Sequence, residues 1–128
     1  MSVKVYWDSP EQTILVYEFE EGWTWDEFYI VYPQAKQMLA SVPHIVNIIL
    51  TYPSSTFYVP PNILSQIRKF YNAMSPNTGL VVVTGGSSIV SSVYNAVRRV
   101  YPFIARRCML ANNIHHARAL LREHRRVS

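Results

Sequence analysis

Hydrophobic positions recur with two different periods along this 128-residue chain, and each period predicts a kind of element. Near the amino terminus, apolar residues alternate with polar ones at about 3–7, which is typical of a strand. At about 13–20, Leu15, Tyr17 and Phe19 share one face of a second strand, and Glu18 and Glu20 leave the far end of its other face half-solvated. These two strands are predicted to form a hairpin. Two continuous runs rich in β-branched residues, 45–51 and 80–84, predict strands that are buried on both faces. A shorter run at about 106–110 predicts a fifth strand.

Between these strands the apolar residues follow a helical spacing. Thr24 and Glu27 match a capping box, in which each side chain accepts a hydrogen bond from the backbone amide of the other residue. Pro33 predicts a kink in that first helix but no break, because the apolar stripe continues in phase beyond it. A second helix is predicted to begin after Pro60-Pro61-Asn62 and to end before Pro76. A third runs from Gly85–Ser88 to Pro102, and a fourth begins at Asn112 or Asn113 as N-cap.

The side chains expected to face the core share this helical spacing. They are Phe28, Val31, Tyr32, Ala35, Leu39 and Val42; Leu64, Ile67, Phe70, Tyr71 and Met74; Ile89, Val90, Val93, Tyr94, Val97 and Val100; and Ile114, Ala117, Leu120 and Leu121.

The resulting order, β-β-α-β-α-β-α-β-α, predicts an α/β fold with a mixed, mostly parallel five-stranded sheet, an N-terminal hairpin and helices packed on the sheet. The length fits a single domain over residues 1–128. Within it, the stretch Ile45–Met74 is expected to be central. Ligands and partners gather where a buried parallel strand ends, so the loop Tyr52–Pro61 is the first place to look for a site.

Composition limits the compartment and the partners. With 49% hydrophobic and 16% charged residues the chain is expected to be globular, and it has no apolar run near the roughly 20 residues that span a bilayer, so no membrane insertion is expected. A single cysteine, Cys108, excludes an internal disulfide. The start, MSVKVYWDSP, has no secretory signal pattern. Together these features predict a cytoplasmic protein.

The distribution of charge bears on catalysis. Between Glu27 and Glu123 there is no acidic residue, so every strand from the third onward ends without a carboxylate. Paired-acid hydrolysis, magnesium-assisted phosphoryl transfer and an acid-oriented histidine all need one, which predicts a protein that is not an enzyme and uses no cofactor. His115 and His116 are neighbours and cannot chelate a metal at i, i+4 spacing, so no metal site is expected.

Eight of the twelve Lys and Arg residues lie between Arg98 and Arg126. They allow a hypothesis of nucleic-acid binding. Solvated helix faces are the favoured interpretation, because no exposed aromatic residues are interleaved with these arginines. The arginines concerned are Arg98, Arg99, Arg106, Arg107, Arg118 and Arg122.

Two stretches could bind something. The first combines hydroxyls and rings suited to a partner interface and consists of Tyr52, Ser54, Ser55, Thr56, Phe57 and Tyr58. The second, Gly85, Gly86, Ser87 and Ser88, joins a strand to a helix N-terminus, where an anion can bind, although a tight turn with a serine cap is the favoured interpretation. A small apolar or anionic ligand between the two stretches, with Trp25 as a further wall, is the alternative to a protein partner.

Several segments resemble the STAS domain of anti-sigma-factor antagonists, in particular its STAS-like branch of small bacterial proteins. They are GWTWDEFY, NIILT with the serine-containing loop after it, PNTGLVVVTG, RRVYP and NNIHHARALL. The resemblance implies a regulatory module that binds a protein partner through the loop after the third strand. It also makes Ser54 and Ser55 candidate phosphosites, although the acidic residue and the glycine of the family motif are missing here. Whether the chain forms a homodimer stays open.

Overall fold

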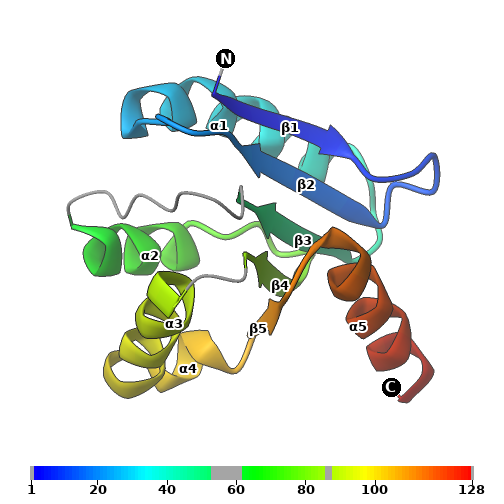
Figure 1. The fold of residues 1–128 in the computed structure, drawn as a ribbon. Helices are drawn as coiled ribbons and strands as arrows, with labels where there is room; N and C mark the ends of the chain where they lie inside the picture. Colours follow the sequence, from blue (N-terminus) through cyan, green and yellow to red (C-terminus); the bar gives the residue numbers. More distant parts are fainter. Residues whose placement is uncertain (1, 53–61, 86–87, 128) are drawn as a thin grey trace.

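The computed structural model describes residues 2–52, 62–85 and 88–127 and confirms the expected α/β class (Figure 1). The elements, in chain order, are β1 (Val3–Trp7), β2 (Ile14–Phe19), α1 (Trp25–Ala40), β3 (Val46–Thr51), α2 (Ile63–Asn72), β4 (Thr78–Thr84), α3 (Ser88–Val100), α4 (Pro102–Ala105), β5 (Cys108–Ala111) and α5 (Ile114–Val127). Sequence reasoning missed the short α4. Pro102 was expected only to end the third helix, but it also begins the next one, where its missing amide costs nothing.

The five strands lie in the sheet in their chain order, β1-β2-β3-β4-β5, so β3 is central as expected. The β1–β2 pair is antiparallel and every other pair is parallel. When successive parallel strands are added in one direction by crossovers of the usual right hand, the crossover helices all lie on one face. α1, α2 and α3 are these helices. α5 follows the last strand and covers the opposite face (Figure 1).

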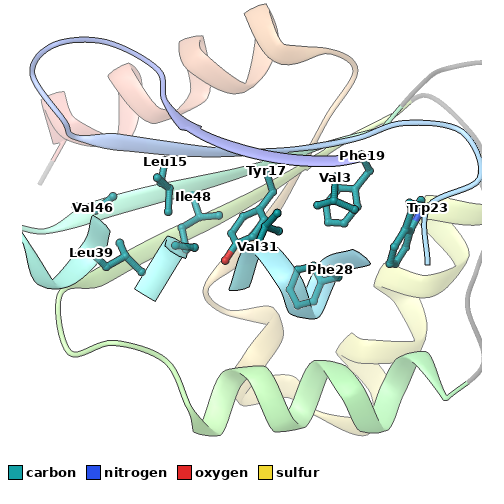
Figure 2. Close-up of a cluster of buried hydrophobic side chains, with 11 residues drawn as sticks. Val3, Leu15, Tyr17, Phe19, Trp23, Phe28, Val31, Leu39, Val46 and Ile48 are labelled. Carbon is teal, nitrogen blue, oxygen red and sulfur yellow. The ribbon is translucent and has the colours of Figure 1, made fainter. Parts of the chain in front are cut away.

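Alternation along the strands divides the interior into two cores. On one face Leu15, Tyr17 and Ile48 pack against α1 in the larger cluster (Figure 2). On the other face Val16 and Ile49, the next residues along the same strands, pack with α5. Both faces of β2 and β3 are therefore apolar where these residues lie, which explains why these segments show little alternation of apolar and polar residues.

The start of α1 keeps only half of the expected capping box. The Thr24 hydroxyl accepts a hydrogen bond from the Glu27 amide at 3.2 Å, as predicted. The Glu27 carboxylate does not return the bond to the Thr24 amide. It accepts instead from the Ser2 amide at 2.9 Å and from the Thr24 hydroxyl at 3.4 Å. The hydrogen bond from the Ser2 backbone lowers the pKa of Glu27 below its ordinary value. The first strand is thereby tied to the first helix.

Helix α1 runs through Pro33 without a break, and this proline lies on its exposed side. The helix end is held by the Asn77 side chain, whose amide nitrogen donates to the backbone oxygens of Leu39, at 2.9 Å, and His44, at 3.1 Å. Asn77 therefore connects the end of α1 to the turn before β4 by hydrogen bonds. At the other end of the chain Asn113 caps α5 by accepting from the His116 amide at 2.9 Å, which confirms one of the two predicted N-caps.

A bulge interrupts the pairing of β3 with β4. Val46 pairs with Thr78 but Ile48 pairs with Val81, so β4 carries one extra residue. The Asn47 side-chain oxygen accepts a hydrogen bond from the extra amide, that of Leu80, at 2.8 Å. Because Thr78 and Val81 pair with residues of the same face, the bulge turns the Thr78 side chain toward the α1 side of the sheet.

The helices α2 and α3 are less buried than their patterns predict. No residue of α2 is buried, although Leu64, Ile67, Phe70 and Tyr71 were expected to be, and α2 ends before Met74, the fifth residue of that predicted stripe. On α3, Val90 and Val97 are buried as expected, but Ile89 is 42% exposed and Val100 is 54% exposed. The reason lies in what these helices contact. α2 is held to α1, where the Tyr29 hydroxyl donates to the side-chain oxygen of Gln66 at 2.7 Å. Three apolar residues of α2 join a separate cluster with α3 and α4: Leu64, Ile67 and Tyr71.

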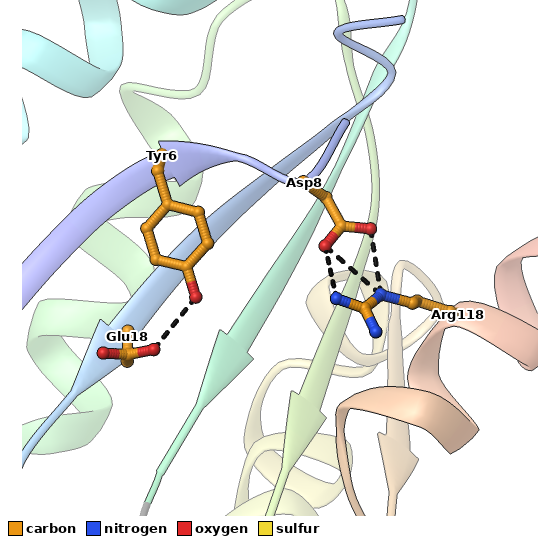
Figure 3. Close-up of polar contacts among 4 residues, drawn as sticks. All are labelled: Tyr6, Asp8, Glu18 and Arg118. Atoms are coloured by element: carbon orange, nitrogen blue, oxygen red, sulfur yellow. Dashed lines mark hydrogen bonds and ion pairs between the residues drawn. The ribbon is translucent and has the colours of Figure 1, made fainter. Parts of the chain in front are cut away.

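An ion pair holds α5 to the hairpin. The Arg118 guanidinium donates to both oxygens of the Asp8 carboxylate: Nη2 donates to Oδ1 at 2.7 Å, and Nε donates to Oδ2 at 3.0 Å and to Oδ1 at 3.2 Å (Figure 3). On the neighbouring strands the Tyr6 hydroxyl donates to Glu18 at 2.9 Å. Burial, followed by this carboxylate, raises the pKa of Tyr6 to about 12. Across the residues that the structure describes, none of the helices is both long and apolar enough to span a membrane.

Candidate functional site

A cavity of about 240 Å³ lies between the α1 side of the sheet and the helices α1, α2 and α3. On its helix side, no residue of α2 is buried, and most apolar residues of α2 pack with α3 and α4. The described residues that line it are mostly aromatic and aliphatic: Tyr17, Phe19, Trp23, Trp25, Phe28, Tyr32, Lys36, Leu39, Ile48, Leu50, Tyr52, Ile63, Ile67, Phe70, Tyr71, Ala73, Met74, Ser75, Thr78, Val81, Val83, Val90, Val93, Tyr94, Val97, Ile104, Arg107, Cys108 and Leu110.

One end of the cavity is a stack of rings at the carboxyl ends of β2 and β3. Phe19 and Tyr52 are stacked with their centroids 4.6 Å apart, and Trp23 lies 4.8 Å from Phe19. Tyr52 was predicted to contact a partner; the structure places its ring inside this stack, where burial raises the pKa of its hydroxyl. The far wall joins Phe28 of α1 to Phe70 of α2, with centroids 4.9 Å apart.

Tyr17 lies in the middle of the sheet-side wall. Its side chain is 7% exposed, and its hydroxyl has no hydrogen-bond partner among the described residues (Figure 2). Burial raises the pKa of this phenol, which therefore stays protonated at neutral pH. Sequence reasoning placed Tyr17 on an apolar strand face and gave it no role. The alternation of the strand shows which face a tyrosine occupies, but not whether its hydroxyl finds a partner.

The opposite end of the cavity holds the charged groups. The Lys36 ammonium donates to the backbone oxygen of Ala73, the residue that ends α2. The Arg107 guanidinium donates to the sulfur of Met74, the next residue, at 3.3 Å. Ser75 and Thr78 line the same end, and the buried hydroxyl of Thr78 has no partner among the described residues. Arg107 was a candidate from the sequence only for nucleic-acid binding, and Lys36, Ser75 and Thr78 were not candidates, because these residues come from three separate segments.

The lining offers little for catalysis. None of the described lining residues is Asp, Glu or His. Cys108 lies in the wall, but burial raises the pKa of its thiol to about 11, so it is neutral at pH 7 and a poor nucleophile. In the part of the chain that the structure describes, no three His, Cys, Asp or Glu side chains are grouped to hold a metal ion.

Two other predicted stretches are only partly described. Ser54, Ser55, Thr56, Phe57 and Tyr58 lie outside the described residues, as do Gly86 and Ser87. Ser88 is the first residue of α3. Gly85 ends up beside Tyr52: a side chain at Gly85 would have its Cβ 3.8 Å from the Tyr52 Cβ. The structure thus brings the ends of β3 and β4 together, as expected for neighbouring parallel strands.

The arginines do not form one basic surface. Arg98 and Arg99 lie on α3, whereas Arg118 and Arg122 lie on α5, across the sheet from it (Figure 1). Arg118 is also paired with Asp8. This arrangement favours the interpretation as solvated helix faces over a continuous nucleic-acid interface.

Comparison with known protein families, with curated proteins and with solved structures finds no match to this chain. The resemblance to STAS domains therefore stays a prediction, and function has to be argued from the cavity.

Proposed function

We propose that this protein binds a small, mostly apolar ligand in the cavity between the sheet and α1, α2 and α3, and does not convert it chemically. The observation that carries the proposal is the cavity itself: about 240 Å³ with an almost wholly apolar wall, at the position where α/β proteins ordinarily have a filled core.

The volume fits a ligand rather than bulk water. An apolar cavity of roughly 150 Å³ stays dry and binds benzene, so 240 Å³ accommodates a molecule larger than one aromatic ring. The cavity is partly open to solvent and its wall is almost wholly apolar, so a ligand that covers the wall removes apolar surface from water, at about 25 cal/mol for each Å² buried.

Binding without reaction is supported by the wall chemistry. The described lining has no carboxylate or imidazole, and its one thiol is held in the neutral form by burial. The aromatic end provides flat apolar surfaces, with Phe19, Trp23 and Tyr52 in mutual contact. Such a wall holds rings and hydrocarbon chains by burial of apolar area, at about 0.8 kcal/mol for each methylene.

A regulatory interaction through the loop Tyr52–Pro61, a cytoplasmic location and phosphorylation of Ser54 or Ser55 remain predictions from the sequence and the STAS resemblance. Most of that loop lies outside the described residues. Ligand binding in the cavity and partner binding at the loop are compatible, because Tyr52 belongs to both: it lines the cavity and is the first residue of the loop.

The test is titration with N-phenyl-1-naphthylamine, an uncharged probe that fluoresces in apolar surroundings. We expect saturable enhancement with the native chain. Val93→Phe should weaken binding about tenfold, because Val93 lines the cavity and the larger ring occupies part of its volume. Val100→Phe is the matched control, since it adds the same ring on the same helix at a position that is 54% exposed. Circular dichroism checks that both variants fold.

Absence of saturable binding to the native chain would overturn the proposal. Equal weakening by the two folded variants would also overturn it, because the probe would then be bound elsewhere. A homologous series of alcohols gives an independent reading: affinity should rise about fourfold for each added methylene until the cavity is full.

A further inference from the structure

The two cations that line the cavity are both held at the carboxyl end of α2. Lys36 comes from α1 and Arg107 from the segment before β5, yet they bind consecutive residues at the end of α2: the Ala73 backbone oxygen and the Met74 sulfur. The carboxyl end of a helix carries partial negative charge, which explains why both cations gather there. Each is also stacked near a ring of the wall, with Lys36 5.7 Å from the Tyr32 centroid and Arg107 5.8 Å from that of Tyr71.

These two charges are not neutralised by acidic residues. The hydrogen-bond partners that Lys36 and Arg107 have among the described residues are a neutral carbonyl and a thioether, and a thioether is a weak acceptor. No described residue of the cavity wall is Asp or Glu. Arg118, on the opposite face of the sheet, differs in this respect, because its charge is paired with both oxygens of the Asp8 carboxylate.

Other polar groups point to the same end. The bulge in β4 turns Thr78, a residue that is 5% exposed, to the cavity side of the sheet, and its buried hydroxyl has no partner among the described residues. Ser75 lines the same end. The other end, around Phe19 and Trp23, is formed by rings. The cavity therefore has one cationic, hydrogen-bonding end and one apolar end.

We infer that the ligand is an amphiphilic anion, a carboxylate with a hydrocarbon or aryl tail, whose head group lies between Lys36 and Arg107 and whose tail extends toward Phe19 and Trp23. The inference rests on the proposed function and adds to it the chemical class of the ligand. A carboxylate accepts charge-assisted hydrogen bonds from both cations, and these are stronger than the bonds to a carbonyl and a thioether that it replaces. Both cations are partly exposed, so the head group reaches the site without deep burial of its charge.

The experiment measures displacement of N-phenyl-1-naphthylamine by decanoate, 1-decanol and decylamine, which share one tail and differ in the charge of the head. In the native chain, decanoate should bind at least tenfold more tightly than decylamine. In Lys36→Met/Arg107→Gln, decanoate affinity should fall about tenfold while decanol affinity changes less than twofold. The decanoate affinity of the native chain, but not of the variant, should also fall as salt is added.

The matched control is Lys69→Met/Arg106→Gln. It removes the same charge from α2 and from the residue next to Arg107, at positions that do not line the cavity. Decanoate binding should be unchanged in it. The inference is overturned if decanoate loses affinity equally in both double variants, or if decylamine competes as well as decanoate while the probe still binds. If neither the probe nor decanol binds the native chain, the proposed function itself fails.

Discussion

Replacing Gly79 by alanine tests whether the bulge of β4 is built around the Asn47 side chain. A Cβ at position 79 would lie 2.3 Å from the Asn47 side-chain oxygen and 2.9 Å from the Ile45 Cγ2. Ile45 is 58% exposed, so the tip of its side chain can rotate away. The Asn47 oxygen cannot move so freely, because it accepts the hydrogen bond from the Leu80 amide at 2.8 Å.

The cost follows from that lost hydrogen bond. Moving the Asn47 oxygen far enough to relieve the contact leaves a half-buried amide without an acceptor, at about 1–3 kcal/mol. Alanine in place of glycine restricts the unfolded chain and returns about 0.4–1 kcal/mol. We therefore expect Gly79→Ala to lower the free energy of unfolding by about 1–2 kcal/mol. With a urea m-value of about 1–3 kcal/mol per M, the midpoint should fall by roughly 0.5–1 M.

The assay is urea unfolding followed by tryptophan fluorescence, carried out as a double-mutant cycle with Asn47→Ala. Without the Asn47 oxygen nothing but Ile45 opposes the new methyl group, so Gly79→Ala should be neutral or slightly stabilising in that background. Gly22→Ala is the control: nothing lies within 4 Å of its Cβ and its φ is +82°, so its cost, of about 1 kcal/mol from backbone strain, should be the same in both backgrounds. An equal loss from Gly79→Ala with and without Asn47 would refute the reasoning.

Three further substitutions test other contacts. Asp8→Asn should lower the free energy of unfolding by about 1–2 kcal/mol, because Arg118 loses a bidentate carboxylate partner. The Arg118 side chain is 35% exposed, so the loss should be smaller at high salt. Urea unfolding at two salt concentrations measures this, and a loss that does not depend on salt would contradict it. Glu27 has a pKa below its ordinary 4.5 in the folded protein, so its contribution is present above that pH and lost as the pH falls. Glu27→Gln should therefore flatten the acid side of the stability profile, and an unchanged slope below pH 4.5 would speak against the Ser2 contact. Tyr17→Phe should change stability by less than about 0.5 kcal/mol or increase it, since its hydroxyl has no described partner; a loss above 1 kcal/mol would reveal a partner.

The proposed ligand would explain why α2 and α3 leave a cavity between themselves and the sheet. α2 is tied to α1 through Tyr29 and Gln66, and most of its apolar residues pack with α3 and α4, so no residue of α2 is buried. The cavity wall below α2 and α3 lacks the side-chain contacts of a filled core. In our proposal the tail of the ligand takes the place of those missing contacts.

Apart from the short α4, the order and class of the elements were decided locally, and the sequence alone predicted them. Period-2 alternation in the hairpin, β-branched runs at β3 and β4, and the caps at Thr24 and Asn113 depend on neighbouring residues. The rules of chain connection then place β3 in the centre and three helices on one face.

Only the tertiary structure decided the cavity and its charged end. A helical stripe shows the direction in which Leu64 or Ile67 points, but it does not show how far the opposing sheet lies, so an apolar face against a cavity looks the same in sequence as one in a filled core. Lys36 and Arg107, which both bind residues at the end of α2, are likewise 71 positions apart in the sequence (107 − 36). Spacing along the chain carries no information about such a contact, because it depends on the distances between packed elements.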